Sequence, residues 1–330
     1  MSSLIPSLNI SIEAPNILIE HSDKLMLMGS CFSEHIGKRL SDCKFQVLEN
    51  PNGILFNPLS VTHSLSQYID NTTIDTDRLF YLNEIWHHWD FHSRFSNINK
   101  ERAILQIQDA IKTAHLFLKD ADWLMITLGS AFQYYLKDEN YFVANCHRAP
   151  GKLFEKRLLK IDEIQEALVD VVESLKYFNP KLKIIFTISP VRHIRDGVVD
   201  NNRSKARLIE TVHHLVEQFD HCYYFPAYEL LIDVLRDYRF YDTDLIHPNF
   251  GATKLIWDQF HNIFFSKETQ FIADQMLEII TAYNHKVQFP ETDNYKNFKS
   301  KYLNKIIQLK QKYNYIDFAK EEAYFSNQNK

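Results

Sequence analysis

Short apolar runs bounded by turn-forming residues alternate along the chain with longer segments of helical spacing. Five runs have the length and composition of buried strands: residues 25–28, 45–49, 123–128, 183–188 and 222–227. Between them, apolar residues recur every three or four positions, as in segments 32–40, 164–175 and 204–219. This alternation predicts an α/β fold, a doubly wound three-layer sandwich with a mainly parallel five-stranded sheet. A ligand crevice is then expected beyond the carboxyl ends of the strands.

Two segments depart from this alternation, and both are predicted to be insertions near the site. Residues 59–118 lie between the second and third strands and contain the aromatic, histidine-rich run YLNEIWHHWDFHSRF. Residues 132–146 read as a hairpin that turns at Lys137 to Asn140.

The composition changes after Tyr283, where Lys, Asn and Tyr become frequent. In this part of the chain four apolar or aromatic residues recur at helical spacing: Tyr302, Ile306, Leu309 and Tyr313. They predict an amphipathic helix that packs on the body of the protein or on a partner. We therefore divide the chain into a main domain over residues 1–283 and a C-terminal helical extension over residues 284–330.

Charge and cysteine content exclude several classes of function. The formal net charge is −5 and the lysine clusters are concentrated near the C-terminal end, so nucleic acid is not expected as a partner. Four cysteines are too scattered for a disulfide framework or a paired zinc motif, and each is predicted to be a free thiol: Cys31, Cys43, Cys146 and Cys222. Cys43 and Cys222 are interpreted as small buried hydrophobic residues.

The N-terminal stretch MSSLIPSLNISIEAP has neither the basic region nor the continuous apolar core of a secretory signal. No apolar run reaches the roughly 18 residues needed to span a bilayer. We therefore predict a cytoplasmic location without a transmembrane segment. No pattern in the sequence predicts a cofactor or an oligomeric state.

Candidate chemistry begins in the stretch LMLMGSCFSEHIG, where the first strand runs through Gly29 into a helix. A tight turn at this place can present a nucleophile beside free backbone N–H groups. Cys31 is the strongest intrinsic nucleophile, because a helix N-terminus can lower a thiol pKa from its usual value of about 8.5. Ser30 and Ser33 would need a general base, and serine at such a junction is also a common N-cap.

A second candidate lies far downstream, in RFYDTDLIHPNFGATK. Asp244 precedes His247 by three residues, a spacing that lets the carboxylate fold back and accept a hydrogen bond from Nδ1–H. Nε2 would then be free to act as a base. Taken alone, an Asp-x-x-His pair also occurs as a surface or capping feature.

The order of these two motifs resembles that of the SGNH (GDSL-like) hydrolases, and within them the GSCFA group named for its N-terminal motif. This chain has GSCFS at 29–33. The resemblance extends over about residues 20–265 and includes six further segments: 50–58, 126–134, 143–150, 186–197, 201–206 and 242–252. It implies an SGNH or flavodoxin-like three-layer fold.

The resemblance also implies roles for individual residues. The nucleophilic serine of the Gly-Asp-Ser block falls on Cys31 and its aspartate on Ser30, which indicates either a cysteine nucleophile or a shift of one residue to Ser30. The final block places the orienting carboxylate on Asp244 and the base on His247.

The resemblance places two glycines at the oxyanion, although each could equally serve only to adopt a positive φ in a tight turn. Gly53 corresponds to the glycine of the second block, and Gly129 opens the third block. The asparagine of that block is missing, because the chain continues Ser-Ala-Phe after Gly129. Asn145, at the end of the predicted hairpin, is our candidate for the replacement donor.

His88, Asp90 and His92 would share one face if their segment were extended, a spacing compatible with metal ligation. We favour a polar strand edge or a hydrogen-bonding loop instead and predict no metal, because a site would need further ligands. The GSCFA pattern has a His-Ser pair at this place, which resembles His92-Ser93. His92 is therefore interpreted as a pocket residue.

Further pocket residues are expected where strands end. Arg192 could hold a substrate carboxylate or phosphate as a bidentate donor, or form a structural ion pair. His147 and His193 are alternative bases.

The leading hypothesis is hydrolysis of an ester or related acyl group through a covalent acyl-enzyme. The substrate would be a small molecule or an acylated glycan or lipid. An acyltransferase with the same intermediate and a non-catalytic binding module are the alternatives.

Overall fold

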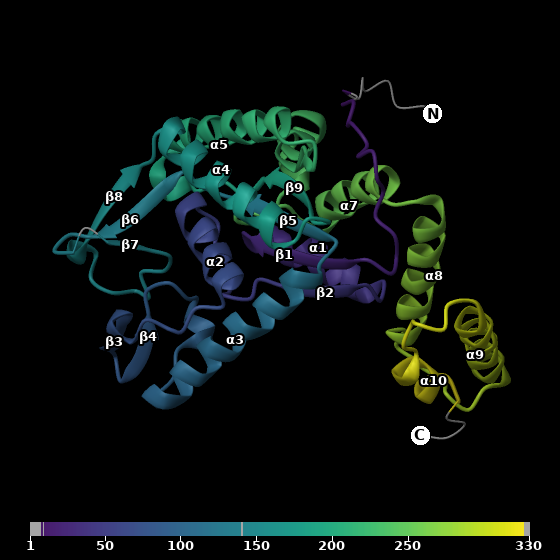
Figure 1. Cartoon of the computed structure of the whole chain (residues 1–330). Coiled ribbons are helices and arrows are strands. Elements are labelled where there is room, and N and C mark those ends of the chain that lie inside the picture. Colours follow the sequence, from purple (N-terminus) through teal and green to yellow (C-terminus); the bar gives the residue numbers. More distant parts are fainter. Residues whose placement is uncertain (1–7, 9, 140, 327–330) are drawn as a thin grey trace.

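The computed structural model describes residues 8, 10–139 and 141–326 (Figure 1). A central sheet contains β1 (Lys24–Gly29), β2 (Gln46–Glu49), β5 (Trp123–Leu128), β9 (Lys183–Ile188) and β10 (Cys222–Phe225). Its order is β10-β9-β5-β1-β2, and every neighbouring pair is parallel. The predicted five-stranded parallel sheet is confirmed. From β1 the chain adds β2 on one side of the sheet and then β5, β9 and β10 on the other side. The strand order therefore reverses between β1 and β5.

The strands are apolar on both faces because helices cover both sides of the sheet. One face packs against α2 (Pro58–Asp70), α3 (Lys100–Asp120), α4 (Ile161–Phe178) and α5 (Val198–Gln218). The other face packs against α1 (Cys31–Asp42), α7 (Phe250–Phe264) and α8 (Lys267–Tyr283). Alternate residues of β1 serve the two faces, since Leu25 and Leu27 belong to one cluster and Met26 and Met28 to the other. The three-layer sandwich is therefore confirmed.

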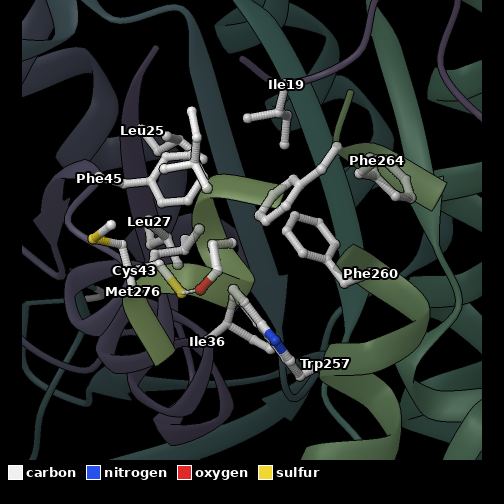
Figure 2. Packing of buried hydrophobic residues seen from close by; sticks show 14 of the residues in the cluster. Ile19, Leu25, Leu27, Ile36, Cys43, Phe45, Trp257, Phe260, Phe264 and Met276 are labelled. Carbon is white, nitrogen blue, oxygen red and sulfur yellow. Dashed lines mark hydrogen bonds between the residues drawn. The ribbon is translucent and has the colours of Figure 1, made fainter. Parts of the chain in front are cut away.

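Figure 2 shows the face covered by α1 and α7. Leu25 and Leu27 of β1 lie among aromatic side chains that include Phe45, Trp257 and Phe260, all of them buried. Cys43 is fully buried in the same cluster, and Cys222 is buried on the opposite face, as predicted. All four cysteines are free thiols.

The first predicted insertion is narrower than residues 59–118. Its outer parts are α2 and α3, which pack on the sheet as ordinary crossover helices through Val61, Leu65 and Leu118. Only the middle departs from the layers, as an antiparallel hairpin of β3 (Leu79–Leu82) and β4 (Ile85–His88).

The second insertion contains the predicted hairpin, formed by β6 (Phe132–Leu136) and β7 (Tyr141–Val143). Asn140, at the end of the expected turn, lies outside the described residues. A third strand, β8 (Phe154–Leu158), pairs with the free side of β6. Its sequence FEKRL carries three charged residues, so no apolar run in the sequence predicts this strand.

The short helix α6 (Ala227–Glu229) continues into a π-helix over Leu230–Leu235 after the last strand. Beyond α8, the chain forms α9 (Asp293–Lys312) and α10 (Ala319–Ser326), which lie beside α8 at one end of the molecule (Figure 1). The predicted amphipathic helix is confirmed, since Tyr302, Ile306 and Leu309 are the buried residues of α9. They join the cluster that covers the α1 face of the sheet.

Candidate functional site

The loop after β1 is a sharp turn that requires a glycine. Gly29 has φ +138°, and a Cβ at this position would lie 2.2 Å from the carbonyl oxygen of Thr127 on β5. The N–H of Ser30 donates to that same carbonyl at 3.2 Å. The turn therefore lies against the carboxyl end of β5, where the strand order reverses and a ligand crevice is expected.

The three nucleophile candidates of this loop have different environments. Ser30 is buried and caps α1, because its Oγ accepts from the N–H of Phe32 at 3.2 Å. Ser33 is fully buried and its Oγ donates to the carbonyl of Met28. Cys31 is the first residue of α1 and is only partly buried. Of the three side chains, Cys31 alone combines solvent access with a position at the helix N-terminus.

Burial raises the pKa of the Cys31 thiol, and the nearby Glu34 raises it further. The backbone N–H groups of Cys31 and Phe32 and the ammonium of Lys205 act in the opposite direction. The net shift is upward, so the thiol holds its proton at neutral pH. Nucleophilic attack by Cys31 therefore calls for a base or a stabilising positive charge.

The loop between Phe240 and α7 forms the hydrogen bond that the sequence predicts. Nδ1 of His247 donates to Oδ2 of Asp244 at 2.6 Å, and the backbone N–H groups of Ile246 and His247 donate to Oδ1 at 2.9 and 3.0 Å. The pKa of Asp244 is lowered to about 2, mainly by the hydrogen bond from the His247 side chain. Nε2 of His247 forms no hydrogen bond within the described parts of the chain. The proton is thus held on Nδ1, and Nε2 is left free to accept a proton as a base. The side chains of Asp244 and His247 are both nearly half exposed.

Contacts between α1 and α7 place the His247 loop beside α1. The guanidinium of Arg39 on α1 lies over the rings of Phe250 and Trp257 on α7. His247 precedes α7, and its charge contributes to lowering the pKa of His35 on α1, a shift due first to desolvation. His247 is therefore near His35 of α1. No hydrogen bond joins His247 to Cys31 in this conformation of the described chain.

Comparison with known families decides the classification of this chain. The family model described as the GSCFA family matches residues 24–260, which include both loops. The chain belongs to the GSCFA family. A second model, described as the C-terminal domain of the GSCFA domain protein, matches residues 276–330. That match begins within α8, whereas we placed the boundary after Tyr283, and this division stays a prediction. No curated protein matches the chain.

Two glycines of this GSCFA domain do not have the free N–H groups that an oxyanion needs. The N–H of Gly53 donates to the carbonyl of Asn50 at 2.7 Å, and that of Gly129 donates to the carbonyl of Phe56 at 2.7 Å. Both glycines instead allow close packing. A Cβ on Gly53 would lie 2.1 Å from Cβ of His92, and Gly53 has φ +86°. In this conformation both N–H groups are engaged by backbone carbonyls, and the role of Gly53 and Gly129 as donors stays a prediction.

Asn145 and His147 belong to the packing between the two insertions. Oδ1 of Asn145 accepts from the N–H of His147 at 2.8 Å, while Nε2 of His147 donates to the carbonyl of His88 at 2.9 Å. Burial lowers the pKa of His147 to about 4. Within the described residues, neither forms a hydrogen bond or ring contact with the Cys31 loop or the His247 loop. The structure thus gives both residues a local packing role.

His88 ends β4 and Asp90 lies in the hydrogen-bonded loop that follows, in agreement with the favoured polar strand edge or hydrogen-bonding loop. Asp90 pairs with the guanidinium of Arg78 at 2.6 Å, and Nε2 of His88 bonds to the carbonyl of Asp75. His92 lies over Gly53, and its pKa is lowered by burial and by Arg94. Across the described residues, no three His, Cys, Asp or Glu side chains gather in a way that could hold a metal ion.

Arg192 and His193 follow β9, at the same edge of the sheet. His193 packs its ring 4.9 Å from Phe56, and burial, assisted by the charge of Lys205, lowers its pKa to about 4. Arg192 lines a cleft of about 340 Å³ together with Tyr241 and with Leu245 of the His247 loop. Nε of Arg192 is buried without a partner, and no described carboxylate forms an ion pair with it. The ion-pair alternative for Arg192 is therefore not realised.

Two polar residues of the site were missed from the sequence. Asn50 follows β2 and is buried, and its Oδ1 accepts from the N–H of Gly29 at 2.9 Å. Nδ2 of Asn50 is buried without a partner among the described residues. Lys205 is buried on α5, three residues before the core residue Leu208. A lysine in this apolar position of the helix was the signal that could have identified it.

Among the helices of the described chain, none combines the length and the apolar character needed to cross a bilayer.

Proposed function

We propose that this GSCFA protein is an SGNH-like hydrolase that cleaves an ester or related acyl group through an acyl-enzyme on Cys31. The observation that carries the proposal is the Asp244–His247 hydrogen bond of 2.6 Å, on a loop beside the helix that begins at Cys31. The strand order and the order of the motifs along the chain support the SGNH relationship. A cytoplasmic location remains part of the proposal.

The reaction needs one proton carrier. Nε2 of His247 takes the proton of the Cys31 thiol while Sγ attacks the acyl carbon. The imidazolium then gives this proton to the leaving alcohol, and a water molecule attacks the thioester with the same histidine as base. The carboxylate of Asp244 holds Nδ1–H and stabilises the imidazolium. Since His247 is nearly half exposed, water can reach this base for the second step.

The oxyanion would be held by donors other than the expected glycines. The N–H of Cys31 is the first of α1 and has no acceptor within the helix. Nδ2 of Asn50 is a buried donor without a partner, on a side chain that binds Gly29 next to the nucleophile loop. We assign these two groups to the oxyanion, with Asn50 in place of the missing asparagine of the third block.

Acyl-enzyme formation tests the proposal directly. The protein is incubated with p-nitrophenyl acetate, quenched in acid and examined by intact-mass spectrometry, and peptide mapping locates the acetyl group. We expect one acetyl group on Cys31, and none on Cys31 in His247→Ala. The variant His193→Ala serves as the matched histidine control and should still be acetylated. Acetylation that is absent, or equal in wild type and His247→Ala, contradicts the proposal and favours a binding module.

Replacing Arg192 tests its role in substrate binding. If its guanidinium holds a carboxylate or phosphate of the substrate, Arg192→Met should raise KM for an anionic ester about tenfold or more, because a charge-assisted hydrogen bond is worth about 1.5–3 kcal/mol. KM for an uncharged ester of the same length should change little. Steady-state kinetics with the two esters measure this difference. Equal effects on both KM values would show that Arg192 only shapes the cleft.

A further inference from the structure

The cleft beside the His247 loop is lined by segments that follow the last two strands of the sheet. It has a volume of about 340 Å³ and lies between the π-helix Leu230–Leu235, the residues after this helix, and Leu245. Arg192, which follows β9, also lines it. Leu245 precedes His247 by two positions, so a molecule in the cleft contacts the loop of the proposed base. Single turns of π-helix are frequent at functional sites.

Leu245 has a backbone conformation that leucine ordinarily avoids. Its φ is +57°, in the left-handed region, where glycine and asparagine are favoured and a bulky side chain is strained. Nine non-glycine residues of the described chain have a positive φ, and Leu245 is the only aliphatic one among them. A second one, Arg236 with φ +44°, lines the same cleft. Residues held in this region cluster at ligand-binding and active sites.

The loop itself does not need a leucine at this position. The N–H of Leu245 donates to the carbonyl of Asp242 at 2.9 Å. The carboxylate of Asp244 is held by the N–H groups of Ile246 and His247. Glycine or asparagine would keep all of these bonds without the strain. The leucine side chain is 53% exposed, so burial in the free protein offsets little of it, and the surface that this side chain offers is a wall of the cleft.

The charges of the cleft favour an anion. Two arginines and two aspartates line it, but Asp237 already accepts from the backbone N–H and the guanidinium of Arg239, at 2.8 and 3.0 Å. The other three charged residues, Arg192, Asp233 and Arg236, have a net charge of +1. None of them forms an ion pair with another described residue.

Arg192 is the charged group of the cleft with the least access to water. Its Nε is buried without a partner, whereas Asp233 and Arg236 are exposed. Burial raises the pKa of Tyr241 and the charge of Arg192 opposes that rise, so this hydroxyl lies near the guanidinium but brings no negative charge. A carboxylate or phosphate would bring that charge and can accept from two guanidinium N–H groups at once.

We propose that this cleft is a substrate subsite for an apolar group that ends in a carboxylate or phosphate, and that Leu245 determines its specificity. The apolar part packs on Leu245 and Ile232, and the anion binds Arg192. The inference rests on the proposed function, because it assigns the substrate class of that hydrolase: esters in which an apolar stretch separates the scissile bond from an anion. Binding in the cleft needs no reaction and can be measured with unreactive compounds.

Ligand-observed NMR titrations of the full chain with four compounds test the subsite. Phenylacetate and phenyl phosphate combine a ring with an anion, benzyl alcohol lacks the charge, and inorganic phosphate lacks the ring. We expect one of the aromatic anions to bind about tenfold or more tightly than either partial compound. Tighter binding of phenylacetate assigns the anion to a carboxylate, tighter binding of phenyl phosphate to a phosphate, and both support the subsite. Aromatic anions that bind no better than inorganic phosphate overturn the proposal.

Leu245→Asn separates a ligand contact from a structural role. Because asparagine tolerates the left-handed region, the Tm of this variant should equal or exceed that of wild type. Its affinity for the preferred aromatic anion should fall about fivefold or more, while the affinity for inorganic phosphate changes little. Leu153→Asn, at an exposed leucine outside the cleft, should leave both affinities unchanged. Unchanged binding of the aromatic anion in Leu245→Asn overturns the proposal, whatever the Tm.

Two further variants keep the subsite and the proposed function apart. If Leu245→Asn does not fold, Arg192→Met decides, since an affinity for the aromatic anion equal to that of wild type overturns the subsite. If the anions bind as expected but Cys31→Ala retains acyl hydrolysis, the proposed function fails and the subsite stands. If they do not bind and Cys31 is essential, only the subsite fails.

Discussion

Replacing Cys31 with alanine should reduce kcat/KM for ester hydrolysis by about 10⁴-fold or more, because the covalent pathway is lost and only binding and oxyanion stabilisation remain. The fold should tolerate the change. Cys31 is only partly buried, and alanine is a good helix former at the start of α1. Initial rates with an activated ester, with circular dichroism to verify folding, measure this effect.

Ser30→Ala is the matched control, since it removes the neighbouring hydroxyl of the same turn. Ser30 caps α1 through the N–H of Phe32, so its loss should cost about 1 kcal/mol of stability. Activity should remain within about tenfold of wild type if serine acts only as a cap. The opposite pattern, an inactive Ser30→Ala and an active Cys31→Ala, would assign the nucleophile to Ser30 and contradict our choice.

The sheet could be predicted from the sequence because parallel strands buried on both faces are continuous apolar runs, as in β5 and β9. The strand β8 could not, because its pairing partner β6, and not its own apolar content, makes it a strand. The first insertion was overestimated for a related reason. The packing of α2 and α3 on the sheet is a long-range contact that the local sequence does not show. The aromatic and histidine-rich residues between the two helices instead made the whole segment look like an insertion.

The candidate site was predictable where chemistry depends on neighbours in sequence. Asp244 lies only three positions before His247, so one loop fixes their hydrogen bond. The availability of the expected oxyanion donors depends on backbone conformation at Gly53 and on a contact between distant segments at Gly129. Whether Gly53 and Gly129 have free N–H groups is decided by the carbonyls of Asn50 and Phe56. No spacing rule contains that information.

Lys205 was missed for another reason. A lysine among apolar residues looks like an interruption of the core pattern until its two partners, the carbonyls of Gly129 and Ser189, are known. The same logic applies to Asn50, which is identified by a buried donor without a partner and not by a motif.

Replacing Asp244 with asparagine should lower kcat by about 10³- to 10⁴-fold while leaving the loop in place. The side-chain oxygen of asparagine can still accept from the N–H groups of Ile246 and His247. It cannot stabilise an imidazolium, however, and its NH₂ group can donate to Nδ1. That bond would place the proton on Nε2, where it blocks acceptance of the thiol proton. Asp242→Asn, which removes an exposed carboxylate from the same loop, should change kcat less than about threefold.

The pH dependence of kcat distinguishes the role of Asp244 in holding His247 from a general effect of its charge. The pKa of Asp244 is depressed to about 2, so its carboxylate is fully ionised above the usual aspartate range and is lost only as the pH falls through about 2. Any loss of activity in mild acid must therefore arise from protonation of another group. Kinetics between about pH 5 and 8 should show Asp244→Asn below wild type at every pH, because Asp244 stays ionised throughout this range in wild type. If Asp244→Asn remained within tenfold of wild type while Cys31→Ala was inactive, His247 would not be the base, and His193, at the same edge of the sheet, would take its place.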